Sequence, residues 1–285
     1  MRWDKGRESD NIEDRRGMSA GGKGLIGGGI GTVVIALIAL YFGVDPSVVL
    51  NEVGNLTPAQ QQASSAPSSP EDERERKFMS IVLADTEDTW GELFKQSGSQ
   101  YERPKLVLFS GQVESACGFA QAAMGPFYCP GDRKLYLDMS FFNDLASRYG
   151  APGDFAQAYV VAHEVGHHVQ NLLGVADKVN AARSHASEAQ GNALQVRMEL
   201  QADCFAGIWA YHADQARHIL EAGDVEEALA AASGVGDDRL QKRARGVVVP
   251  ESFTHGSSEQ RMRWFGIGAK TGDPKQCDTF KTSRL

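Results

Sequence analysis

Cysteine is scarce in this sequence. Its 285 residues include four cysteines, and no two of them form a C-x-x-C pair. Cysteine-based zinc sites usually contain such pairs, so the pattern disfavours one. Basic residues are fewer than acidic ones: the sequence has 29 lysines and arginines and 37 aspartates and glutamates, which gives a net charge of −8. A nucleic-acid-binding protein needs a basic surface, so this balance argues against that class of function.

Charged residues are missing altogether from residues 24–43. Twenty residues of helix are about 30 Å long, which matches the hydrocarbon core of a bilayer. We expect an uncleaved transmembrane helix here, since a long polar segment precedes the run and no Ala-x-Ala-like cleavage site ends it. A cleaved signal peptide and a buried helix are the alternatives. Gly27, Gly28, Gly29 and Gly31 could let this helix self-associate, or they could be lipid-facing filler.

The charges around this run predict its orientation. Six basic residues lie within residues 1–23, and the acidic residues Asp45 and Glu52 follow the run. By the positive-inside rule, residues 1–23 form a cytoplasmic polar N-terminus and the C-terminal part of the chain lies across the membrane. Residues 44–74 are expected to be a flexible linker, because 57–74 is rich in Gln, Ser, Ala and Pro and ends in a charged run.

Apolar residues at helical spacing begin after Glu75. The pattern predicts one domain over residues 75–285 that is mainly α, an α+β fold with a small sheet. Residues 175–190 are expected to be a loop or a mobile helix. Strands are expected at 105–109 and 134–138, and helices from 75, from 141, over 154–173, over 192–213, over 224–245 with a break at 234–236, and after an N-cap at Ser257.

The sequence His163-Glu164-Val165-Gly166-His167 lies inside one of these predicted helices. Residues four apart on a helix project from one face, so His163 and His167 can bind one Zn²⁺ through two imidazole nitrogens. Glu164 lies beside the first ligand, where a carboxylate can act as general base toward a zinc-activated water. Gly166 would let a second backbone come close. The alternative is two core histidines and a solvated glutamate.

A second pair of residues, Glu199 and Asp203, is also four apart in a helix-favouring segment. Catalytic zinc sites can combine two histidines with a glutamate, so Glu199 is the expected third ligand. Asp203 would accept a hydrogen bond from the free ring N–H of a ligand histidine and fix its orientation. A solvated helix face is the alternative, and the presence of both pairs in one chain weakens it.

The pattern H-E-x-x-H followed by E-x-x-x-D resembles the gluzincin metallopeptidases. The fuller sequence resembles a bacterial family described as "putative neutral zinc metallopeptidase". The resemblance implies a membrane-anchored zinc peptidase with a zincin-like domain, and it does not identify the substrate. Together with the charge distribution it predicts a protein of the bacterial inner membrane with a periplasmic C-terminal domain, which would act on a peptide or protein. The matching stretches are residues 1–3, 7–16, 116–118, 125–130, 161–170 and 199–207.

Resemblance to the zincins adds two expectations. An edge strand commonly holds the substrate backbone beside the active-site helix, and we assign this role to strand 133–138, with a plain sheet strand as the alternative. Gluzincins often add a His, Tyr or Arg that stabilises the oxyanion; His255 and Arg261 are the candidates, with simple packing of the tail as the alternative. His168 should point about 100° away from His167 and is not expected to be a ligand.

The four cysteines predict two disulfides, because the domain is expected outside the cytoplasm. Four cysteines allow three pairings. We favour Cys117–Cys129, which closes a short loop, and Cys204–Cys277, which would tie the second ligand helix to the C-terminal tail.

These observations predict a membrane-anchored zinc metalloendopeptidase. One Zn²⁺ is held by His163, His167 and Glu199, and Glu164 is the general base in peptide-bond hydrolysis. One alternative is a zinc hydrolase of a non-peptide bond. The other is a membrane-tethered binding or assembly module with a structural zinc, which the presence of Glu164 disfavours because structural zinc needs no base.

Overall fold

A computed structural model describes residues 1–16, 69–121 and 125–285. The predicted membrane helix at 24–43, its four glycines and most of the predicted linker lie outside the described residues. Within the described part, no helix combines the length and the apolar character needed to cross a bilayer. Met1–Arg15 and Ser68–Leu285 form one compact unit.

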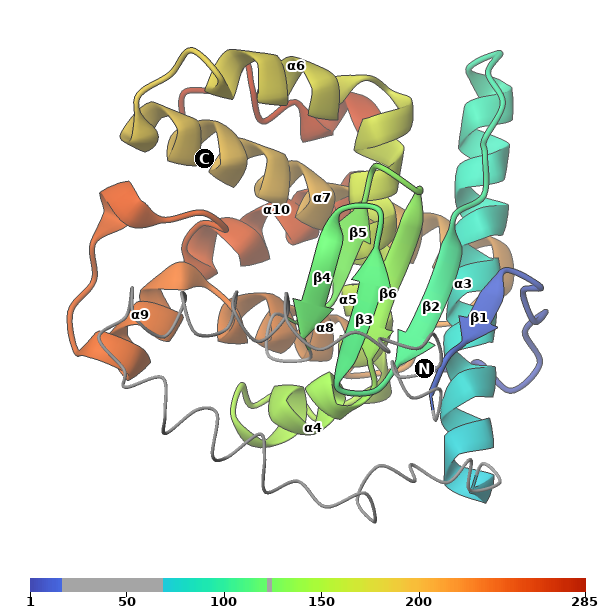
Figure 1. The fold of residues 1–285 in the computed structure, drawn as a ribbon. Helices are drawn as coiled ribbons and strands as arrows, with labels where there is room; N and C mark the ends of the chain where they lie inside the picture. Colours follow the sequence, from blue (N-terminus) through green and yellow to red (C-terminus); the bar gives the residue numbers. More distant parts are fainter. Residues whose placement is uncertain (17–68, 122–124) are drawn as a thin grey trace, which may run out of the picture. The chain divides into compact units, whose positions relative to one another are not determined.

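This unit is mainly helical with small sheets, as the sequence predicted (Figure 1). In chain order its elements are β1 Ile12–Asp14, α3 Pro70–Gln96, β2 Lys105–Phe109, β3 Gln112–Ser115, β4 Gly118–Gln121, β5 Phe127–Cys129, β6 Lys134–Asp138, α4 Ser140–Ser147, α5 Asp154–Leu172, α6 Val175–Arg183, α7 Glu188–Arg217, α8 Asp224–Gly234, α9 Asp237–Arg245, a 3₁₀ turn Pro250–Ser252, α10 Ser258–Thr271 and a 3₁₀ turn Pro274–Cys277. The strands at 105–109 and 134–138 and the helix break at 234–236 are confirmed.

The main sheet has the strand order β1-β2-β6-β5. Strands β1, β2 and β6 are parallel, and β5 is antiparallel to β6. Both faces of β2 are buried: Leu106 and Leu108 join the large helical core, whereas Val107 and Phe109 join a smaller core with Val113 of the β3–β4 hairpin. Burial on both faces explains why this strand is an unbroken apolar run.

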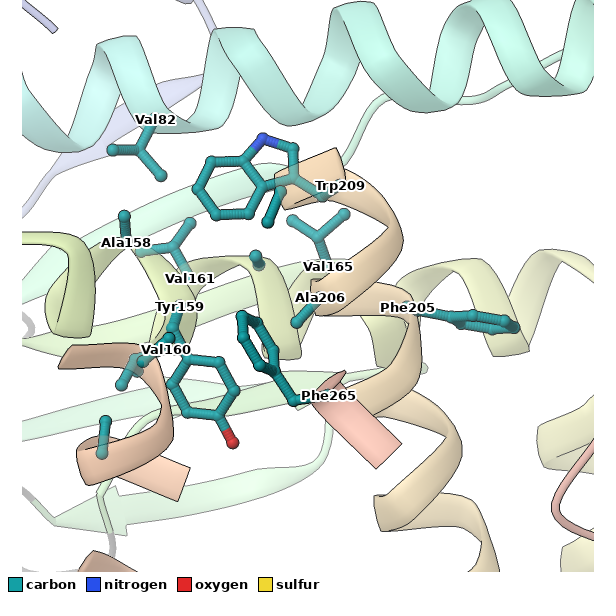
Figure 2. Close-up of a cluster of buried hydrophobic side chains, with 14 of the residues drawn as sticks. Val82, Ala158, Tyr159, Val160, Val161, Val165, Phe205, Ala206, Trp209 and Phe265 are labelled. Atoms are coloured by element: carbon teal, nitrogen blue, oxygen red, sulfur yellow. The ribbon is translucent and has the colours of Figure 1, made fainter. Parts of the chain in front are cut away.

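Helix α5 packs against α3, α7, α8 and strand β5. Figure 2 shows Val161, Val165 and Trp209 gathered in this core, and Trp209 stacks on Phe155 with ring centroids 5.6 Å apart. Because neighbours surround α5, most of its residues are buried. The helix that carries the His-Glu-x-x-His motif is therefore fixed in position by packing.

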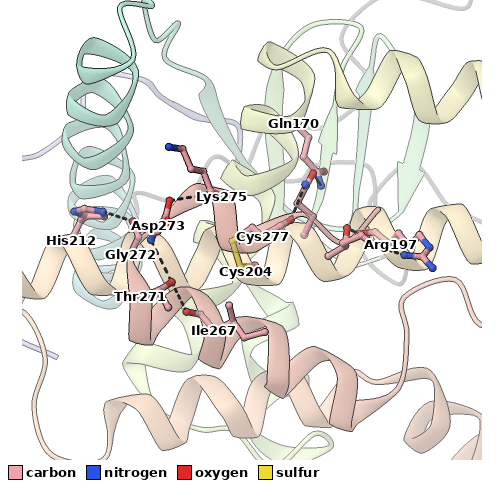
Figure 3. Close-up of a disulfide and its surroundings, with 12 residues drawn as sticks. Gln170, Arg197, Cys204, His212, Ile267, Thr271, Gly272, Asp273, Lys275 and Cys277 are labelled. Carbon is pink, nitrogen blue, oxygen red and sulfur yellow. Dashed lines mark hydrogen bonds between the residues drawn. A yellow bond between two sulfur atoms is a disulfide. The ribbon is translucent and has the colours of Figure 1, made fainter. Parts of the chain in front are cut away.

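The end of the chain is tied to α7. The disulfide Cys204–Cys277 joins α7 to the last 3₁₀ turn (Figure 3), and Cys117–Cys129 joins the β3–β4 hairpin to β5. These are the two pairings that the sequence favoured. A Cβ added at Gly268 of α10 would lie 2.0 Å from the carbonyl oxygen of Cys204, so only glycine permits this approach of α10 to α7.

Two boundaries differ from the prediction. Helix α3 begins at Pro70, within the expected linker, because Ser69 and Asp72 form a reciprocal capping box. The charged run that suggested a linker is the acidic first turn of this helix, a favourable position for negative charge. Helix α7 begins at Glu188, before the predicted start at 192, because Ser187 and Gln190 also form a capping box.

The strand assignments also need correction. Strand β6, nominated as the edge strand, pairs with β2 on one side and β5 on the other, so the edge next to α5 is β5. Strand β1 was not predicted: Glu13, at its centre, receives hydrogen bonds from Lys134 and Arg15. Charged residues of the predicted polar N-terminus, residues 1–23, therefore pair with the folded domain: Glu13 with Lys134, and Arg7 with Glu87.

Candidate metal centre

His163 and His167 lie one turn apart on α5, and Glu199 reaches them from α7. Glu199 Oε2 lies 3.3 Å from His163 Nε2 and 3.4 Å from His167 Nε2. The three ligand atoms lie within 4.8 Å of one another. Two imidazoles and a carboxylate thus converge on one point, as the sequence predicted for a metal site.

The close approach of α5 and α7 produces this convergence. A Cβ added at Gly166 would lie 2.9 Å from the carbonyl oxygen of Ala202, so the helices touch at Gly166. Ala202 is one turn beyond Glu199, and Gly166 lies between the two histidines. The glycine inside the motif therefore sets the distance between the histidines and the glutamate.

Asp203 holds the ring of His163. Its Oδ1 accepts a hydrogen bond from His163 Nδ1 at 2.8 Å and from the Tyr159 hydroxyl at 2.5 Å. Arg261 donates to both carboxylate oxygens, from Nε to Oδ2 at 2.8 Å and from Nη2 to Oδ1 at 2.9 Å. Because Nδ1 donates to Asp203, the Nε2 of His163 is left to face Glu199.

Three glutamine side chains complete the surroundings of the site. Gln170 Oε1 accepts from His167 Nδ1 at 2.9 Å, and its amide group donates to Gln201 Oε1 at 3.1 Å. Gln195 Nε2 donates to Glu199 Oε1 at 2.8 Å. Both histidines therefore direct Nε2 inward, and the other oxygen of Glu199 stays free to face them.

The electrostatics of the site favour positive charge. Burial lowers the pKa of His163, but Asp203 and Glu199 outweigh this and raise it to about 9. Burial likewise lowers the pKa of His167, and Glu199 reverses the effect. Burial raises the pKa of Glu199, yet the two imidazoles hold it well below its usual range. A divalent cation bound between these groups would compensate the negative charge of the carboxylates, as protons on the two imidazoles do in its absence.

Glu164 faces a cavity of about 890 Å³ that also includes His163, His167 and Glu199 in its lining. Its half-buried carboxylate makes no hydrogen bond or ion pair with any residue in the described part of the chain. The cavity lining also includes residues 125–128, which contain the start of edge strand β5. Within the described residues, Glu164 thus offers a carboxylate without a hydrogen-bond partner beside three potential ligands, where it can exchange a proton with a bound molecule.

Comparison with known proteins is consistent with this geometry. The model of the family "Putative neutral zinc metallopeptidase" matches residues 1–280. The chain belongs to this family. Its relatives include the Escherichia coli K12 protein named "Uncharacterized protein YpfJ", 50% identical over 291 residues that cover 99% of this chain and 100% of that protein. The Mycobacterium tuberculosis H37Rv protein named "Uncharacterized protein Rv2575" is 42% identical over 262 residues, 87% of this chain and 86% of that protein. No solved structure matches the chain.

The zinc metallopeptidase family implies zinc, and the donor set fits that metal. Zinc accepts neutral imidazole nitrogen and carboxylate oxygen together, and two histidines with one glutamate form a known catalytic set. The hydrogen bonds to both Nδ1 atoms are those that orient histidine ligands. His163, His167 and Glu199 would hold the ion.

The structure separates the two oxyanion candidates. Arg261 lines the cavity but is 4% exposed, and its guanidinium donates hydrogen bonds to Asp203 and to the Tyr159 hydroxyl, so its oxyanion role stays a prediction. Burial lowers the pKa of Arg261, but Asp203 keeps it well above its usual value. The charge of Arg261 thus compensates that of Asp203.

His255 is placed differently. It lines the cavity with half of its side chain exposed. Its Nδ1 lies 3.2 Å from Asp237 Oδ1, while Asp237 Oδ2 accepts the backbone N–H groups of Thr254, His255 and Gly256. The hydrogen bond to Asp237 raises the pKa of His255. A single carboxylate therefore fixes both the loop and the imidazole.

Sequence reasoning missed several residues of the site. Gln170 lies three residues after His167 and Gln195 four before Glu199, so helical spacing alone could have found both. Tyr159 lies four residues before His163, on the same face. Asp237 and its link to His255 depend on the contact between α9 and the following loop, for which the sequence holds no comparable signal.

Proposed function

We propose that this protein is a zinc-dependent endopeptidase with a zincin-like catalytic domain. One observation carries the proposal: Glu164, which has no hydrogen-bond partner among the residues that the structure describes, lines the same cavity as the three convergent ligands His163, His167 and Glu199. A structural zinc site requires four closed ligands and no free carboxylate beside them. Three ligands and a free base are the composition of a hydrolytic site.

The chain's own residues then have distinct roles. A bound zinc ion would supply Lewis-acid activation of the attacking water and of the scissile carbonyl. Glu164 takes the proton of that water and later delivers it to the leaving amine. His255, oriented by Asp237, donates a hydrogen bond to the carbonyl oxygen as negative charge develops there, an interaction worth a few kcal/mol. Asp203 and Gln170 keep the two ligand imidazoles in their orientation.

An extended peptide fits this cavity better than a small ester or amide. Strand β5 is an edge strand, and its residues line the cavity together with those of α5. A peptide can add to such an edge through main-chain hydrogen bonds. The sequence assigned the binding of the substrate backbone to strand 133–138. We assign it instead to the neighbouring edge strand β5.

The two disulfides support a location outside the cytoplasm, since such bonds persist in oxidising compartments. We therefore place the catalytic domain on the periplasmic side of the bacterial inner membrane. Attachment through residues 24–43 is part of the proposal, because an uncharged run of that length partitions into a bilayer.

Cleavage of an unstructured protein tests the activity. The purified full chain is incubated with fluorescein-labelled casein, and the products are mapped by mass spectrometry. We expect internal cleavage by the wild type, loss of more than 100-fold in Glu164→Gln, and no change in Glu226→Gln, an exposed glutamate on α8. Equal cleavage by wild type and Glu164→Gln would refute the mechanism. Zinc binding without cleavage in either protein would favour the binding module, and hydrolysis restricted to ester substrates would favour the other hydrolase.

A further inference from the structure

The catalytic helix and the edge strand are joined by a chain of hydrogen bonds outside the ligand set. Asn171 Nδ2 donates to the Tyr128 hydroxyl at 3.1 Å, and that hydroxyl lies 3.1 Å from His168 Nδ1. His168 Nε2 lies 2.6 Å from the carbonyl oxygen of Glu102. A carbonyl can only accept, so Nε2 carries the hydrogen and Nδ1 is left to accept from Tyr128.

This series of hydrogen bonds lies between the metal centre and strand β5. His168 directly follows the ligand His167, and its side chain is buried. Tyr128 is the central residue of β5, and the ring of Tyr101 packs edge-on against His168 from the other side. The polar groups of Asn171, Tyr128 and His168 that take part in these hydrogen bonds all have partners, so the arrangement specifies one position of β5 relative to α5.

We propose that His168 is a positioning residue that sets the offset between the edge strand and the metal centre. This inference rests on the proposed peptidase function. A peptide that adds to β5 inherits the register of that strand, so the distance from β5 to His167 determines which bond lies beside Glu164. A shift of about 1 Å in such a geometry can lower a rate by about 100-fold.

Tyr128→Phe tests this without disturbing a ligand. The substitution keeps the aromatic ring but removes the hydroxyl that accepts a hydrogen bond from Asn171 and donates one to His168. Tyr211→Phe is the matched control, because Tyr211 on α7 is outside the cavity lining and its hydroxyl has no hydrogen-bond partner in the described part of the chain. Zinc content and melting temperature are measured for both variants to establish that each folds.

The first readout is hydrogen exchange in peptides that cover residues 125–138. We expect faster exchange in Tyr128→Phe than in wild type or Tyr211→Phe; unchanged exchange would overturn the anchoring. The second is the kinetics of a peptide from casein that the wild type cleaves. We expect kcat to fall about tenfold or more with KM changed less than twofold, because the peptide still pairs with β5 but its scissile bond is displaced from Glu164, whereas an unchanged kcat would overturn the positioning role. Failure of the wild type to cleave anything would refute the peptidase proposal, and the exchange result would then decide the anchoring alone.

A different set of contacts, independent of the catalytic site, concerns residues 1–15. Glu87 of α3 is 1% exposed. Its Oε1 accepts from Ser9 Oγ at 2.6 Å and Asn11 Nδ2 at 2.7 Å, and its Oε2 accepts from Arg7 Nη2 at 2.9 Å. Without these three partners a buried carboxylate would lack its hydrogen bonds, at a cost of several kcal/mol.

The same segment contributes to the sheet and to the core. Ile12–Asp14 pairs with β2 over three residues. Trp3 packs on Phe78 with ring centroids 5.1 Å apart, and the backbone N–H of Arg2 donates to the carbonyl oxygen of Ile219 at 2.8 Å. The segment therefore folds as part of the domain that carries the metal centre.

A single membrane crossing by residues 24–43 would separate these partners, because residues 1–15 would lie on one side and the rest of the domain on the other. We infer that residues 1–15 lie in the same compartment as the catalytic domain. This inference differs from the N-terminus-in arrangement that the charge distribution predicts.

Single cysteines report the compartment of each part. Asp10→Cys and Ser99→Cys both replace exposed residues, one in the N-terminal segment and one in the domain. Spheroplasts are prepared from Escherichia coli cells that produce either full-length variant. They are treated with a membrane-impermeant maleimide before and after lysis. We expect both cysteines to react to the same extent in intact spheroplasts. Reaction of Ser99→Cys with protection of Asp10→Cys until lysis would overturn the inference. Protection of both would support it and contradict the periplasmic location.

Discussion

Arg261 and Asp203 form a two-point ion pair in a part of the core from which solvent is excluded. Their side chains are 5% and 0% exposed, and the two hydrogen bonds measure 2.8 and 2.9 Å. The same carboxylate accepts a bond from His163, so the ion pair connects helix α10 to the metal centre. A tail helix of the chain thus determines the orientation of a ligand on α5.

Removal of the cation from this pair should destabilise the fold. Arg261→Met leaves a buried carboxylate with less compensation, and we expect a loss of about 3–5 kcal/mol in the free energy of unfolding. Urea denaturation measures it. Arg239→Met, at an exposed position on α9, should change stability by less than about 0.5 kcal/mol. Equal stability of the two variants would contradict the structural role of Arg261.

Gln195 should contribute to metal affinity without touching the metal. Gln195→Met removes the hydrogen bond to Glu199 Oε1 and keeps the length of the side chain. Loss of such a partner typically lowers zinc affinity by about 10–100-fold. Competition with a chromogenic zinc chelator measures the affinity, and Gln215→Met, at an exposed position on α7, is the control. An unchanged affinity in Gln195→Met would show that Glu199 needs no such support.

The N-terminal segment should make stability depend on pH. Burial raises the pKa of Glu13, but hydrogen bonds from Lys134, Arg15 and Lys105 outweigh it and lower the pKa to about 2. A lowered pKa stabilises the fold above the unfolded-state pKa of about 4.5, and the contribution is lost as pH falls toward 2. After allowance for partial exposure, we expect about 2 kcal/mol at pH 7.

Glu13→Gln tests this pH dependence. Its stability deficit relative to wild type should be full at pH 7, about three quarters of that at pH 4 and about a quarter at pH 2.5, as measured by urea denaturation at each pH. Glu114→Gln, at an exposed position on β3, should show no deficit at any of these values. A Glu13→Gln deficit that stays constant between pH 7 and 2.5 would mean that this carboxylate is not held ionised by its neighbours.

How much of this could be read from the sequence depends on the range of the interactions. Helical spacing predicted the pairs His163 and His167, and Glu199 and Asp203, because both are local patterns. The edge strand could not be found in the same way, since β5 has three residues and its place follows from pairing with β6. Arg261 was recognised as a site residue, but its partner Asp203 lies 58 residues away, and only the packing of α10 on α7 reveals it.

The disulfide between α7 and the tail should stabilise the domain more than the one in the hairpin. Cys204 and Cys277 are 73 residues apart, against 12 for Cys117 and Cys129. In the chain-entropy model the longer loop contributes about 4 kcal/mol and the shorter about 3 kcal/mol. Paired Cys→Ala substitutions, compared by urea denaturation, measure both. A larger loss from the hairpin pair would show that native-state strain or residual structure outweighs loop entropy.

The metal content of the purified full chain tests the central claim most directly. Elemental analysis is applied to the wild type, to His167→Ala and to His185→Ala, an exposed histidine outside the site. The account predicts one zinc per chain in the wild type and in His185→Ala, and less than about a tenth of that in His167→Ala. A wild type without zinc, or equal zinc in all three proteins, would contradict the assignment of His163, His167 and Glu199 as metal ligands.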